Sequence, residues 1–71
     1  MLSYDDALTR AHDAALNPFK FWNKLEDEIS AQSPDLIRTL QAQALTEHRH
    51  RYHDAAMVIL TMADYALNPS K

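Results

Sequence analysis

The fold of this chain depends on the stretch from Ser33 to Asn68, which reads SPDLIRTLQAQALTEHRHRYHDAAMVILTMADYALN. Ser33 can cap the first free amides of a helix, Pro34 suits the first helical position, and an acidic residue follows. No glycine or proline interrupts the run before Pro69, which disfavours helix at the residue before it. The stretch therefore predicts one continuous helix over about 34–67, on the order of 50 Å long at 1.5 Å per residue.

The amino-acid composition predicts an all-α fold. The chain has 71 residues, with no glycine and no cysteine. Tight hairpins, phosphate-binding loops and oxyanion-hole turns commonly need a positive φ, which glycine supplies at least cost. The absence of glycine therefore argues against β-hairpins, P-loops and dinucleotide-binding folds. A core this small rarely supplies more than about 3–5 kcal/mol, and disulfides are excluded, so we expect stabilisation by a second copy in a homodimer.

Two shorter helices precede the long one, over about 4–16 and 18–32. Ser3 is placed to cap the first of them, and Pro18 both ends the first and suits the first position of the second. Because both helices are short and closely joined, we expect them to fold back along the long helix. The result is a single helical domain over 1–71, a three-helix or helical-hairpin arrangement that dimerisation completes as a helical bundle.

The C-terminal half of the long helix is apolar over well over half of its circumference. Two short helices cannot easily cover so wide a surface, and an uncovered apolar patch on a soluble protein usually marks an interface. We therefore expect the dimer or partner interface to consist of Val58, Ile59, Leu60, Met62, Tyr65 and Leu67.

An aromatic cluster, Phe19-Lys20-Phe21-Trp22, lies near the start of the second helix. In one interpretation Trp22 anchors the helix junction and at least one of the two phenylalanines joins the core. In the other, Phe19, Phe21 and Trp22 form an exposed recognition site, since tryptophan is enriched where binding energy concentrates in protein interfaces. The sequence leaves both interpretations open.

The segment from Glu47 to Asp54, EHRHRYHD, is the only one dense in reactive side chains. On a continuous helix His50, His53 and Asp54 share a face, and three such groups can hold zinc. His50 and Asp54 are equally an ordinary i,i+4 pair on a solvated helix. We expect neither a metal nor another cofactor here.

The same segment is also a candidate nucleic-acid contact. Its candidate recognition residues are His48, Arg49, His50, Arg51, Tyr52 and His53, among which the arginines could touch phosphates and the tyrosine could stack on a base. The two arginines point to different sides of a helix, however, and Tyr52 falls in the apolar seam. The net charge of −3 also argues against a dedicated phosphate-backbone binder, so a nucleic-acid-associated regulator is the alternative function.

Enzymatic activity is not expected, because the chain has no cysteine nucleophile, no recognisable serine elbow and no cofactor motif. The longest apolar run, Ala55 to Leu60, is far shorter than the ~20 residues that span a bilayer, and the acidic start does not resemble a signal peptide. We expect a cytoplasmic protein without a membrane partner. In size, acidity and lack of motifs it is similar to small helical-hairpin regulators, including phage-encoded inhibitors of host proteins. The leading expectation is a homodimeric, non-enzymatic module that binds and modulates, or inhibits, another protein.

Overall fold

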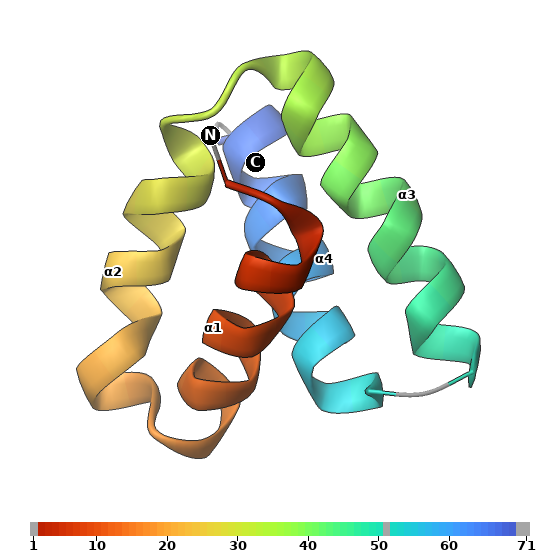
Figure 1. Ribbon diagram of the computed structural model, residues 1–71. Helices are drawn as coiled ribbons and strands as arrows, with labels where there is room; N and C mark the ends of the chain where they lie inside the picture. The colour runs from red at the N-terminus through yellow and green to blue at the C-terminus, as the bar shows by residue number, and fades with distance from the viewer. Residues whose placement is uncertain (1, 51, 70–71) are drawn as a thin grey trace.

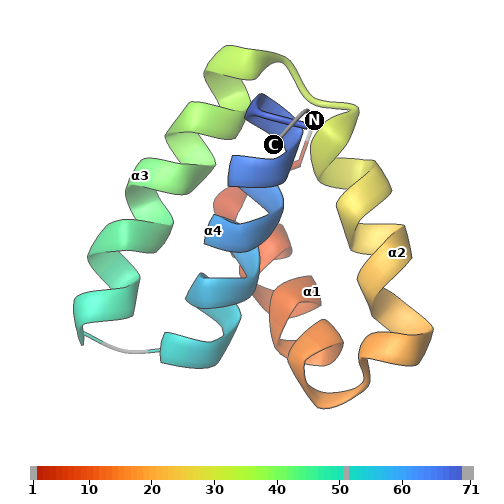
Figure 2. The ribbon, with the colours of Figure 1, turned by 180° about the vertical axis from the view of Figure 1, so that it is seen from behind.

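The computed structural model describes residues 2–50 and 52–69. Within these ranges four α-helices pack against one another: α1 (Tyr4–Leu16), α2 (Pro18–Ser30), α3 (Pro34–His50) and α4 (His53–Leu67). Successive helices run in opposite directions, with α4 in the middle, α3 along one side and α1 and α2 along the other (Figures 1 and 2). The prediction of an all-α fold is confirmed, and four helices replace the expected three.

The single long helix predicted over 34–67 is wrong. The helix is interrupted after His50, and α4 turns back to pack against α3 (Figure 1). Tyr52 lies between them in the left-handed conformation, with φ 57° and ψ 42°, which costs about 1–2 kcal/mol for a residue other than glycine. Turning back buries an apolar face of α4 within the same chain, and burial at about 25 cal/mol per Å² outweighs that local cost.

The core is built from large side chains on three helices and from alanines on the fourth. The largest fully buried side chains are Leu25 and Ile29 of α2, Leu40 of α3, and Ile59 and Met62 of α4. Helix α1 contributes Ala7, Ala11 and Ala14, which are completely buried. Because alanine projects only one carbon, α1 lies close against its two neighbours, α2 and α4.

The expected dimer interface assumed that its six residues are left uncovered by the rest of the chain, and this is wrong for three of them. Val58, Ile59 and Met62 are buried inside the single chain. The three-helix interpretation left them uncovered because it provided only two helices to cover the third, whereas in the structure α1, α2 and α3 all pack against α4. Of the remaining three residues, Leu60 and Leu67 are half-buried, and the Tyr65 side chain is 54% exposed.

Serine caps begin two of the helices, as the sequence predicts. The Asp6 N–H donates to Ser3 Oγ at 3.2 Å at the start of α1, and the Leu36 N–H donates to Ser33 Oγ at 3.3 Å at the start of α3. The beginning of α1 and the end of α4 lie at the end of the molecule where α2 connects to α3 (Figure 1). Over the described ranges, no helix has both the length and the apolar composition that crossing a bilayer requires.

Candidate functional site

The most exposed large apolar side chains of the described residues lie on either side of the turn between α1 and α2. Leu16 is the last residue of α1 and is 74% exposed, and Phe19, in the first turn of α2, is 103% exposed. Pro18 starts α2 so soon after α1 ends that the two side chains are only three residues apart. We call Leu16 and Phe19 the apolar tip.

The aromatic cluster divides between the two interpretations drawn from the sequence. Phe21 and Trp22 are half-buried and pack against the core, as the anchoring interpretation expects. Phe19 instead lies in solvent, as a recognition site requires. The Lys20 ammonium lies 5.3 Å from the centroid of the Phe21 ring, within the range of a cation–π contact, so this lysine covers part of the packed aromatic.

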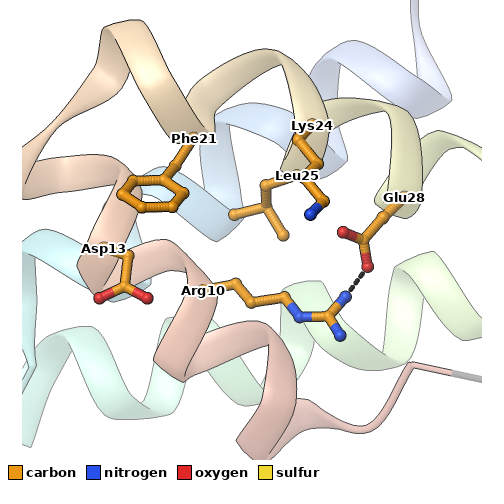
Figure 3. A pocket seen from close by; sticks show the side chains of 6 residues that line it. All are labelled: Arg10, Asp13, Phe21, Lys24, Leu25 and Glu28. Carbon is orange, nitrogen blue, oxygen red and sulfur yellow. Dashed lines mark ion pairs between the residues drawn. The ribbon is translucent and has the colours of Figure 1, made fainter.

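A cleft of about 170 Å³ separates α1 from α2 on the flank of Phe21 (Figure 3). Phe21 and Leu25 form its apolar wall, and charged side chains from both helices surround them. Its full lining is Arg10, Asp13, Phe21, Lys24, Leu25 and Glu28. Arg10 of α1 forms an ion pair with Glu28 of α2, which connects the two helices across one end of the cleft.

The cleft could accommodate an apolar side chain between charged groups. Its charged side chains interact only weakly, because they are accessible to solvent. Both partners of the Arg10–Glu28 pair are partly exposed, and exposed pairs are worth about 0–1 kcal/mol. No polar or charged side chain is buried in the described parts of the chain.

The sequence did not single out Leu16 or the charged lining of the cleft. Leu16 comes two residues after Ala14, so it does not continue the three- and four-residue spacing of the buried alanines of α1. That spacing could have identified Leu16 as exposed. The four charged residues of the cleft come from two helices, and only the pairing of α1 with α2 brings them together. No spacing in the sequence reveals that pairing.

A second hollow, of about 270 Å³, lies between α1 and the beginning of α4. Its lining consists of Leu8, Thr9, His12, Tyr52 and Ala55. The prediction that Tyr52 falls in the apolar seam of one continuous helix is wrong, because that helix is broken, and the residue is 52% exposed. Because Tyr52 stands between α3 and α4, it does not continue the apolar face of one helix into the other.

The histidine segment is divided by the same break. His50 ends α3, whereas His53 and Asp54 begin α4, so the single helical face on which a zinc site would depend does not exist. The rings of His48 and His53 meet edge to face, with centroids 5.5 Å apart and planes at 86°. The described residues include no group of three or more potential ligands that could hold a metal ion.

The basic residues of the alternative function are only partly covered by the structure. Arg51 lies outside the described residues, as do the side chains of Arg49 and His50. His48 is half-buried and His53 is exposed. Of the proposed nucleic-acid contacts, Tyr52 and His53 are therefore those whose exposure the structure establishes.

The sequence matches no protein-family model, and comparisons with curated proteins and with solved structures find no match either. The function is therefore inferred from the surface of the chain itself.

Proposed function

We propose that this chain is a small, non-enzymatic helical module that binds and modulates another protein in the cytoplasm, and that it acts as a homodimer. One observation carries the proposal: Phe19 is fully exposed, and Leu16, three residues earlier in the chain, is 74% exposed. Large aromatic side chains are the commonest source of binding energy in protein interfaces. An exposed phenylalanine close in sequence to a second exposed apolar residue can anchor a partner.

The packing of the chain supports this assignment of the apolar tip. Leu25 and Ile29 of α2 already fill the core, so Phe19 is not needed to stabilise the helix that carries it. The tip also lies at the turn joining α1 to α2, at one end of the molecule (Figure 2). A partner can approach it there without displacing a helix.

The expected partner is a protein with an apolar pocket bordered by basic side chains. The chain carries ten acidic and seven basic residues, and complementary charge steers association and suppresses wrong partners. Occupying such a pocket on an enzyme or regulator would inhibit it, which is the mode of modulation we propose.

Affinity capture from the source cell with matched variants tests the proposal. Parent chain, Phe19→Ala and Met57→Ala are each immobilised, and the captured proteins are identified by mass spectrometry. Met57 is an exposed apolar residue on α4, so it controls for general stickiness. We expect a partner that the parent and Met57→Ala retain and Phe19→Ala loses. Equal capture by all three variants would remove the apolar tip from the proposal.

The homodimer is tested by light scattering over a dilution series. Because Val58, Ile59 and Met62 are buried in one chain, two chains that associate without changing their fold can use only exposed or half-buried residues, and Tyr65→Asp and Leu60→Asp probe that surface. We expect the parent to dimerise. Weaker dimerisation of both variants would assign the interface to that surface, and unchanged dimerisation would assign it to residues that are buried in the single chain. A parent that stays monomeric and folded at the highest concentration contradicts the dimer.

A nucleic-acid-associated regulator is the second candidate, favoured by the exposure of the Tyr52 ring, which makes a stacking surface accessible. A gel shift on nonspecific DNA at low and at moderate salt tests it. Binding that weakens steeply with salt would support this candidate, because phosphate contacts release counterions. No shift at low salt would exclude it.

A further inference from the structure

The residue that precedes α4, Tyr52, is held in a backbone conformation that it does not favour. Tyr52 has φ 57°, and it is the only residue of the described ranges other than glycine with a positive φ. A residue with a Cβ atom avoids this region, which glycine adopts readily. Such a conformation persists when the surrounding packing imposes it, here the packing of α4 against α1, α2 and α3.

The backbone that follows Tyr52 is already helical. The Ala56 N–H donates to the Tyr52 carbonyl at 2.9 Å, which is already the i to i+4 pattern of an α-helix. No side chain caps the start of α4. If Tyr52 moved to the right-handed conformation, the first amides of α4 could bond to the last carbonyls of α3, which a helix break leaves without helical partners.

The other two connections cannot behave in this way. Pro18 stands at the beginning of α2 and Pro34 at the beginning of α3, and a proline both lacks the N–H and disfavours helix before it. No proline or glycine stands anywhere between Pro34 and Pro69. Only the connection at Tyr52 joins two helices that the sequence allows to fuse.

A straightened chain would need a second copy. The buried face of α4 consists of Ala55, Ala56, Val58, Ile59, Met62 and Ala63, and straightening would remove it from α1, α2 and the body of α3. A second copy straightened in the same way exposes the surface of α1, α2 and α3 on which α4 packs in the monomer. Each α4 can then repeat its packing on the other chain, so the two-fold dimer keeps the monomer's contacts and changes only the connection.

We infer that Tyr52 is a hinge and that the dimer of the proposed function forms when two copies exchange α4, each with a continuous helix from Pro34 to Leu67. The inference rests on the homodimer part of the proposed function. Short connections under backbone strain are known to favour exchange. The occupant of the surface that α4 vacates is thus a second copy of this chain.

Distances between two spin labels within one chain test the exchange. Thr39 of α3 and Thr61 of α4 are both exposed, and the chain has no native cysteine, so Thr39→Cys and Thr61→Cys provide unique attachment sites. These positions are 22 residues apart, which is about 33 Å along a continuous helix, whereas packed helix axes lie about 8–10 Å apart. Refolding labelled chain with a tenfold excess of unlabelled chain ensures that only distances within a chain are measured.

The outcomes separate this inference from the proposed function. We expect the dimer fraction to show the long distance and the monomer fraction the short one. A dimer with only the short distance overturns the exchange and leaves the dimer intact. A chain that is monomeric at every concentration overturns both the exchange and the homodimer. Partner binding through Phe19 is tested separately by the capture experiment.

Two hinge variants that both remove the Tyr52 ring give opposite predictions. Glycine adopts the left-handed conformation at little cost, which stabilises the monomer, and it weakens the continuous helix of the dimer. Because a dimer contains two hinges, Tyr52→Gly should raise the dimer dissociation constant at least about a hundredfold. Tyr52→Ala keeps the penalty on the left-handed conformation and favours helix, so it should lower that constant severalfold.

Thr46→Gly is the matched control, because Thr46 is exposed on α3 away from the hinge. It weakens the same helix in the monomer and in the exchanged dimer, so the dissociation constant should stay within about threefold. Equal effects of Tyr52→Gly and Tyr52→Ala would show that the ring, and not the backbone, controls dimerisation, which overturns the hinge.

Discussion

At the scale of single residues, identical residues close together in the sequence differ in their exposure to solvent. Phe19 and Phe21 are two residues apart in the same helix, yet Phe19 is fully exposed and Phe21 packs against the core. On α1, Ala14 is completely buried and Ala15 is exposed. The same substitution at each member of such a pair isolates the contribution of packing.

Phe21→Ala and Phe19→Ala should differ in stability. We expect Phe21→Ala to lower the free energy of unfolding by about 1–3 kcal/mol, because a half-buried aromatic loses part of its transfer free energy and leaves a gap. Phe19→Ala should stay within about 0.5 kcal/mol of the parent, as surface substitutions do. Urea unfolding followed by circular dichroism measures both, and equal losses would show that Phe19 packs in solution.

Ala11→Leu should destabilise the chain, and Ala15→Leu should not. Ala11 is completely buried where α1 packs against α2 and α4, so three added carbons overpack the contact at a cost of about 1–3 kcal/mol. For a domain of this size, each kcal/mol lowers Tm by about 4–8 °C. A Tm for Ala11→Leu that equals that of Ala15→Leu would contradict the close approach of α1.

At the scale of secondary-structure elements, each helix begins with a recognisable local signal except α4. Serine side chains cap α1 and α3, and proline begins α2 and α3. Helix α4 instead follows a left-handed tyrosine without a side-chain cap. Local residues therefore determine where three helices begin, whereas packing determines where α4 begins.

Ser3→Ala should destabilise α1 through its cap. The Ser3 hydroxyl accepts the Asp6 N–H, and replacing a capping serine by alanine costs about 0.5–2 kcal/mol. Ser30→Ala is the control, because Ser30 is exposed at the C-terminal end of α2 and caps no helix start. Urea denaturation should give a lower midpoint for Ser3→Ala only, and a matching decrease in the control would reject the cap.

The ion pair between α1 and α2 should contribute little to stability. Arg10 and Glu28 are both partly exposed, so a double-mutant cycle with Arg10→Gln and Glu28→Gln should give a coupling energy below about 1 kcal/mol. That coupling should shrink as salt is added, because exposed charges are screened. A larger, salt-independent coupling would mean that the cleft in Figure 3 is closed to solvent in solution.

At the scale of the whole molecule, the four helices form a nearly isometric body of 27 × 26 × 25 Å. One continuous helix over 34–67 would alone span about 50 Å. The difference is produced by α4, which packs against all three other helices (Figure 2). Helix α4 is therefore the element on which the fold of the single chain depends.

Met62→Asp should unfold the chain, whereas Thr61→Asp should leave it folded. Met62 is completely buried on α4 and Thr61 beside it is exposed. An unpaired charge in the core costs several kcal/mol, which exceeds the roughly 3–5 kcal/mol that a core of this size supplies. Far-ultraviolet circular dichroism reports the loss of helix, and a helical Met62→Asp chain would contradict the central position of α4.

The amino-acid sequence alone was sufficient to predict the fold class, the two N-terminal helices and the caps at Ser3 and Ser33. These features depend on backbone preferences within a few residues, such as the fixed φ of Pro18 and the need for glycine in tight turns. The sequence also identified the aromatic cluster. It did not identify Phe19 as its exposed member, because exposure depends on which helices cover each flank of α2.

Tertiary structure alone decided the break at Tyr52, and with it the number of helices, the burial of Ile59 and Met62, and the separation of His50 from His53. Every residue from Pro34 to Leu67 is compatible with one helix, so no local preference predicts an interruption. A continuous helix would leave the apolar face of α4 in water within a single chain. The left-handed tyrosine costs about 1–2 kcal/mol, and burying that face against α1, α2 and α3 stabilises the chain by more than this amount.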